Sequence, residues 1–97
     1  MIQRVKTNSS NELYNNANDE KRVYDIEANI NISESAMNNV DSGVVKKGGV
    51  RVANFSWWDT NRMNITYQDV DVTERNNINV AVDAFINEVN KDISGKQ

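Results

Sequence analysis

Two residue types that carry much of enzyme chemistry are missing from this chain, which has no cysteine and no histidine. Without cysteine there is no disulfide bond and no thiol nucleophile. The two absences together exclude Cys/His zinc sites, haem ligation by imidazole, and Ser-His or Cys-His catalysis. We therefore expect no enzyme activity, no catalytic residue, no metal ligand and no cofactor.

Long apolar segments are also missing. No run approaches the roughly 18 apolar residues of a membrane span, and the N-terminus has no apolar signal-peptide segment. We therefore expect a cytoplasmic protein that does not bind a membrane. With 97 residues, of which 38% are hydrophobic and 26% charged, the chain has room for one small core.

The charge is unevenly distributed. The net charge of the whole chain is −3. Residues 44–68 carry Lys46, Lys47, Arg51 and Arg62 against Asp59 alone, a net +3, so the remainder carries −6. The basic segment leaves a single-stranded nucleic acid or another anionic ligand as one alternative for the partner.

The clearest strand signal lies between residues 22 and 33. Its apolar residues fall on even positions: Tyr24, Ile26, Ala28, Ile30 and Ile32. Its polar residues fall on odd positions: Asp25, Glu27, Asn29 and Asn31. A strict period of two predicts a strand with one buried and one solvated face.

Two hairpins are expected after it. Residues 33–43 are polar, with one turn of helix expected around Ala36, Met37 and Val40 and a chain turn at 41–43. Gly48-Gly49 predicts a tight turn between strands at about 44–46 and 50–58, which sets Val45 opposite Val52.

The second hairpin joins the strand at about 50–58 to one at about 62–70. A three-residue turn at 59–61 pairs Trp57 with Met63 and Phe55 with Ile65, which puts the apolar residues on one face. Trp57 then belongs to the core, and Trp58 points to the outer face, opposite Arg62.

A long helix is expected at about 74–93. Apolar residues recur at helical spacing: Ile78, Val82, Phe85, Val89 and Ile93. Thr73 is the predicted N-cap residue. Asp69, Asp71 and Glu74 lie near this helix start, but their spacing does not match a calcium loop, so helix capping and cross-strand pairing explain them more simply.

These elements predict a two-layer α+β domain over residues 22–97, with a mostly antiparallel sheet of three to five strands. The long C-terminal helix covers one sheet face and leaves the other open. Residues 1–21 are polar, and we expect them to form a loosely packed or disordered arm.

The open face is the candidate site. An exposed tryptophan beside an arginine is typical of a protein interface, and the candidate interface residues are Trp58, Arg62, Arg51, Val45, Val50 and Val52. Stacking of Trp58 on Arg62 and cover by the N-terminal arm are the alternatives. We expect a small non-enzymatic domain that binds a protein partner or forms a homodimer. An inhibitor protein encoded by a phage or mobile element is a third interpretation.

Overall fold

The computed structural model describes residues 2–7, 11–33, 36–59 and 62–95. Six strands precede a single helix in the described part of the chain. Their bounds are β1 Gln3–Thr7, β2 Asn11–Asn15, β3 Asp25–Ser33, β4 Ala36–Lys47, β5 Val50–Asp59, β6 Arg62–Tyr67 and α1 Val72–Ser94. Each strand pairs antiparallel with its neighbours in sequence, so the sheet order is β1-β2-β3-β4-β5-β6.

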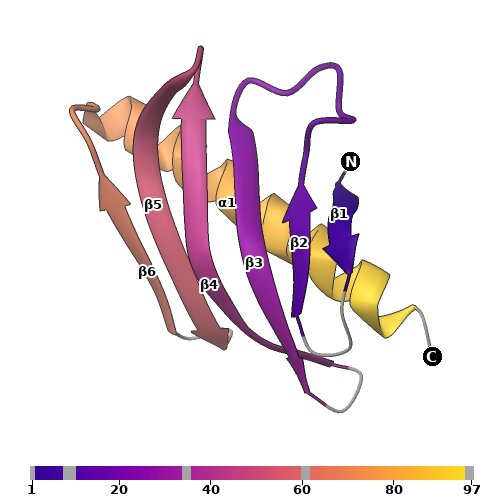
Figure 1. Ribbon diagram of the computed structural model, residues 1–97. Helices are drawn as coiled ribbons and strands as arrows, with labels where there is room; N and C mark the ends of the chain where they lie inside the picture. Colours follow the sequence, from indigo (N-terminus) through magenta and orange to yellow (C-terminus); the bar gives the residue numbers. More distant parts are fainter. Residues whose placement is uncertain (1, 8–10, 34–35, 60–61, 96–97) are drawn as a thin grey trace.

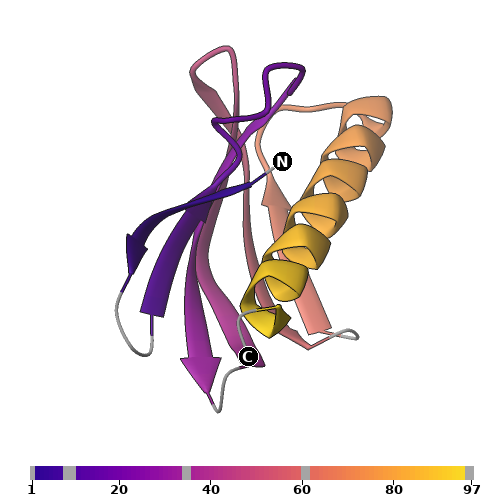
Figure 2. The same cartoon turned by 90° about the vertical axis from the view of Figure 1, so that its right-hand side faces the viewer.

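The helix lies on one face of this sheet and crosses it diagonally (Figure 1). It starts beside the end of β6 and ends beside β1 and β2. Figure 2 shows that all of α1 lies on the same side of the sheet and that no described segment covers the other side. The predicted class, a two-layer α+β fold with one long C-terminal helix and an open antiparallel sheet, is confirmed.

The N-terminal segment differs from the expectation. Instead of a loose arm, its described residues form β1 and β2, which extend the sheet beyond the predicted strand number. In β2, Tyr14 is fully buried and Glu12 is 6% exposed. This strand was missed because one of its two core-facing residues is a carboxylate, so the segment shows no apolar alternation.

Strand β4 is much longer than predicted and includes the residues expected to form a helical turn. A bulge lies between Val40 and Gly43, where Ser42 adopts a left-handed backbone with φ of 43°. Because an extra residue in a bulge shifts the alternation, the buried residues change from the even Val40 to the odd Val45. The sequence pattern therefore does not look like a single strand.

The core lies between the sheet and α1. From the helix it takes Ile78, Val82, Phe85, Ile86, Val89 and Ile93. The ring of Phe85 meets Phe55 of β5 edge to face, with centroids 6.4 Å apart. Phe55 also lies against Gly43 of β4, where a Cβ atom would come within 2.6 Å of the ring. Glycine is therefore required at this close approach of strand and ring.

All three tyrosines of the chain tie the sheet to the helix through their hydroxyl groups. Tyr14 donates to Asp92 Oδ2 at 2.5 Å, and Tyr67 donates to Asn79 Oδ1 at 2.6 Å. Tyr24 donates to Glu74 Oε2 at 2.6 Å. Because these bonds lie near both ends of α1, they fix the diagonal along which the helix crosses the sheet.

The surroundings of two of these tyrosines favour the neutral hydroxyl. Burial raises the pKa of Tyr14 well above its usual value, helped by hydrogen bonds with Asp92 and Glu12. Burial, followed by the hydrogen bond to Glu74, raises the pKa of Tyr24 to about 12. Both hydroxyls therefore remain donors to the helix through the neutral pH range.

The helix begins two residues earlier than predicted, and its N-cap residue is Asp71 rather than Thr73. The Asp71 carboxylate accepts from the backbone N–H of Glu74 at 2.8 Å. This satisfies one of the unpaired donors at the helix start, and the negative charge suits the positive end of the helix dipole.

Candidate functional site

The two tryptophans lie at the end of β5, next to the connection to β6. Figure 1 shows that this end of the sheet lies away from the line of α1. We call the region formed by Trp57, Trp58, Arg62, Met63 and Ile65 the hairpin end. Three of its apolar side chains, Trp57, Met63 and Ile65, pack against the core but remain only partly buried. Because α1 crosses the sheet diagonally, it does not cover these side chains completely.

The register of this hairpin agrees with the prediction over most of its length. Trp57 pairs with Met63, and Phe55 pairs with Ile65. The predicted turn residues Thr60 and Asn61 lie outside the described residues. The expected pairing of Trp58 with Arg62 is wrong, because a bulge makes Trp58 the extra residue and sets Asp59 opposite Arg62.

Trp58 is nevertheless the most exposed aromatic feature of the described chain, with 51% of its surface accessible. Arg62 is also exposed. Its side chain points to the open face, because the adjacent Met63 points to the core and side chains alternate along a strand. An indole and a guanidinium group are thus both accessible at the same end of the sheet.

Two of the predicted interface valines are core residues. Val45 is fully buried, and Val52 is 9% exposed. The predicted Val45–Val52 pair does not form, because a bulge sets Val45 opposite Ala53 and leaves Val52 as the extra residue. Neighbouring residues in a bulge can point to the same side, and here Val52 and Ala53 are both buried.

The third valine, Val50, is 65% exposed but lies on the helix side of the sheet. Its cross-strand partner is Lys47, and residues opposite each other share a face. Lys47 Nζ reaches Glu74 Oε1 of α1 at 2.7 Å, which identifies that face. Val50 is therefore not part of the open surface.

Arg51 remains on the open face, as predicted. It is exposed and pairs with Lys46, which in turn pairs with Asp25 of β3. Asp25 accepts from Arg22 Nε at 2.5 Å. The open face thus carries two like charges directly opposite each other, Lys46 and Arg51, at the end of the sheet away from the hairpin end.

Asparagine side chains form a ladder across the open face. Asn11 Nδ2 donates to Asn31 Oδ1 at 2.7 Å, and Asn31 Nδ2 donates to Asn39 Oδ1 at 2.6 Å. These residues lie opposite one another on β2, β3 and β4. The ladder satisfies polar groups that would otherwise need water, so this part of the face is internally paired.

A shallow hollow of about 320 Å³ lies elsewhere on the open face, beside the bulge of β4. Its lining includes Ser42, Gly43, Arg51, Asn54, Asn64 and Thr66. The carbonyl oxygen Oδ1 of Asn54 is buried there and accepts no hydrogen bond. In contrast to the asparagine ladder, this hollow has a polar atom that the described chain leaves unsatisfied.

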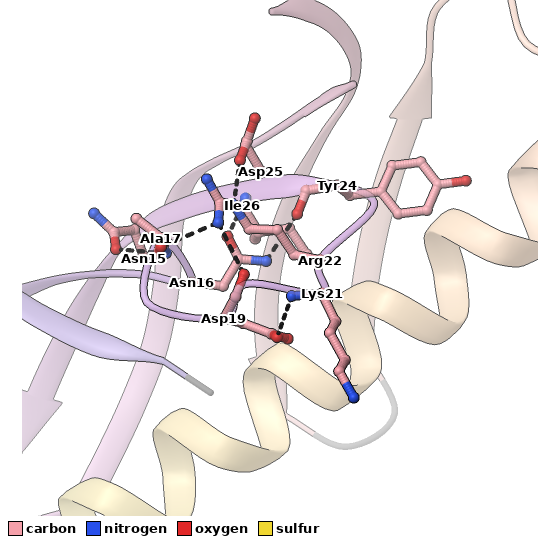
Figure 3. A network of polar contacts seen from close by, with 9 residues as sticks. All are labelled: Asn15, Asn16, Ala17, Asp19, Lys21, Arg22, Tyr24, Asp25 and Ile26. Atoms are coloured by element: carbon pink, nitrogen blue, oxygen red, sulfur yellow. Dashed lines mark hydrogen bonds and ion pairs between the residues drawn. The ribbon is translucent and has the colours of Figure 1, made fainter. Parts of the chain in front are cut away.

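The opposite corner of the sheet is closed by the loop between β2 and β3, whose hydrogen bonds are shown in Figure 3. Asn16 accepts from the Ile26 backbone N–H at 2.8 Å and donates to the Tyr24 carbonyl at 2.8 Å. Arg22 Nη1 donates to the carbonyls of Ala17 and Asp19 at 3.0 and 2.8 Å. Side chains thus hold the loop backbone in one conformation.

A cleft of about 300 Å³ lies between this loop and the flank of α1. Its apolar lining includes Val23, Tyr24, Val80, Ala81 and Phe85. Asp19 also lines it, and the hydrogen bond from the backbone N–H of Lys21 lowers the pKa of the Asp19 carboxyl.

The acidic residues near the start of α1 have structural partners. Glu74 accepts from Tyr24 and Lys47, and these two hydrogen bonds, Lys47 first, lower its pKa.

Within the described residues, no group of three or more acidic side chains is placed to hold a metal ion. The described helix does not combine the length and the apolar composition that a membrane crossing requires.

Comparison with known proteins finds no family model, no curated protein and no solved structure that matches this chain. The candidate site is therefore defined by geometry alone. The residues that the structure brings together at one end of the sheet are Trp58 and Arg62, joined by Trp57, Met63 and Ile65, which the sequence had assigned to the core. The partial exposure of these three residues follows from the diagonal path of the helix, which the sequence pattern does not reveal.

Proposed function

We propose that this protein is a non-enzymatic interaction domain that docks a protein partner at the hairpin end. The observation that carries the proposal is the 51% exposure of Trp58. A tryptophan left in water forgoes a large burial free energy, and aromatic side chains of this kind are the commonest anchors of protein interfaces.

The surroundings of Trp58 support this function. Arg62, the other residue type enriched at such anchors, is exposed on the neighbouring strand. Trp57 and Met63 add partly buried apolar surface beside it. A partner that covers the hairpin end would bury an aromatic anchor together with an apolar margin, with Arg62 at the polar rim.

The test compares partner capture by the wild type, Trp58→Ala and Val80→Ala. Val80 is 70% exposed on α1 and serves as a matched control for loss of exposed apolar surface. We expect the Trp58 variant to lose at least about tenfold in affinity for a captured partner, as at interface hot spots, and the Val80 variant to bind like the wild type. Equal binding by all three proteins would overturn the proposal.

A second candidate, binding of a single-stranded nucleic acid or another anionic ligand, is favoured by one observation. Lys46 and Arg51 are like charges in directly opposite positions on the open face. Salt separates the two functions, because phosphate contacts make affinity fall steeply with ionic strength, whereas an aromatic anchor does not. Substitution of Arg51 by Gln should reduce that salt dependence without affecting capture through Trp58.

A further inference from the structure

The edge strand β6 offers a row of backbone groups that no described segment uses. β6 is the last strand of the sheet and pairs only with β5. The Gln68 backbone N–H donates to the Val52 carbonyl at 2.9 Å, so Gln68 faces β5. Because donors alternate between the two sides of a strand, the N–H groups of Met63, Ile65 and Tyr67 point away from the sheet.

Beyond the charged Arg62 at its start, this edge lacks the residues by which edge strands usually resist pairing. Residues 63–67 include no proline, glycine or charged residue. Their side chains alternate between partly buried apolar residues on the helix side and exposed polar residues on the open side: Met63, Ile65 and Tyr67 against Asn64 and Thr66. An added strand with the same alternation would extend both faces.

We propose that β6 pairs with β6 of a second copy, in antiparallel register with Ile65 opposite Ile65 of the other copy. This inference rests on the proposed function and names the partner. The register sets Met63 opposite Tyr67 on the apolar side and Asn64 opposite Thr66 on the polar side. Three pairs of residues then exchange about two hydrogen bonds each, all through the outward-facing groups.

Charge complementarity favours a second copy as the occupant. The start of β6 carries the basic Arg62, and the chain directly after its end carries Asp69 and Asp71. An antiparallel copy sets the basic start of each β6 beside the acidic segment that follows the other. The contact is isologous, so each such attraction occurs twice.

The first test is the mass of the protein in solution. Sedimentation equilibrium from micromolar to millimolar concentration should show a rise from 11.0 kDa toward twice that mass. Ile65→Pro removes the central outward N–H, whereas Ile65→Ala removes most of the side chain and keeps that donor. We expect the dimerisation affinity of the Pro variant to be at least about tenfold lower than that of the Ala variant.

Amide hydrogen exchange of the wild type gives a second readout that does not depend on how well the Pro variant folds. In the dimer, the amides of Met63, Ile65 and Tyr67 should gain protection as concentration rises, while Asn64 and Thr66 stay protected throughout by β5. A wild type that stays monomeric at all concentrations, or a dimer in which these three amides exchange rapidly, overturns the inference.

The outcomes also separate this inference from the proposed function. A monomeric wild type whose capture of another protein depends on Trp58 would overturn β6 pairing and leave the proposed function standing. A dimer that forms through β6 while Trp58→Ala changes no binding would support the pairing and remove Trp58 as the docking anchor.

Discussion

The two corners of the sheet that the diagonal helix leaves uncovered are treated differently. At one corner the β2–β3 loop folds in and is fixed by side-chain hydrogen bonds of Asn16 and Arg22. At the other, the hairpin end, Trp57 and Met63 pack against the core but are only partly covered by the described chain. The incomplete cover at the hairpin end is therefore a local feature, because the β2–β3 loop covers the opposite corner of the same sheet.

The largest effect on this comparison is expected from Trp57. Trp57→Ala should lower the free energy of unfolding by about 2–3 kcal/mol, less than the 3–5 kcal/mol typical of a fully buried aromatic residue, because Trp57 is only partly buried. Trp58→Ala should cost under about 1 kcal/mol, since its surface is half exposed. Urea denaturation of both variants measures the difference; equal losses would show that the two indoles share one environment.

The loop corner should respond less. Asn16→Ala removes two hydrogen bonds to the backbone of Tyr24 and Ile26 and should cost about 1–2 kcal/mol, because the groups left behind are partly shielded from water. Asn18→Ala is the control, since Asn18 is exposed and makes one long hydrogen bond of 3.2 Å. If the Asn16 variant unfolds at the same urea concentration as the control, the loop is not held by this side chain.

The smallest effect should come from the ion pair at the start of α1. Lys47 first, and Tyr24 second, lower the pKa of Glu74 below its ordinary value of 4.5. A depressed carboxyl pKa adds stability at pH values above the unfolded pKa, and this stability is lost as the pH falls through the folded pKa. The melting temperature of Glu74→Gln should therefore be lower than that of the wild type at neutral pH, and the two should converge in acid.

A melting-temperature difference between wild type and Glu74→Gln that stays constant from neutral pH down to acid would contradict this assignment. Tyr24→Phe is the useful comparison, because it keeps the Lys47–Glu74 pair and removes only the tyrosine hydrogen bond. Its melting temperature should retain most of the wild-type dependence on pH in the acid range.

The sequence was sufficient where one physical rule dominated. Alternation along residues 24–32 identified β3, and matching of apolar residues identified the β5–β6 register, including Phe55 opposite Ile65. Helical periodicity identified α1 to within two residues at its start. In each case the buried side chains were apolar and evenly spaced, so period and polarity gave the same answer.

The sequence failed where a bulge or a buried polar group broke the pattern. The bulges at Ser42 and Val52 each shift the alternation by one residue, which hid the length of β4 and placed Val52 on the wrong face. Strand β2 was missed because of Glu12. A carboxylate is expected to face solvent, and its burial here depends on the partner Tyr14, which the sequence does not reveal. The exposure at the hairpin end depends on the path of α1, which no local pattern encodes.

The strict sequential order of the strands has a consequence for how the chain reaches its native state. Every strand finds its partners immediately before or after it in the chain, so no pairing requires the closure of a long loop. Topologies dominated by such short-range pairing tend to form quickly, because little chain entropy is lost before a contact is gained. We expect the sheet to assemble by hairpins, and the three tyrosine hydroxyls to engage only when the helix settles last.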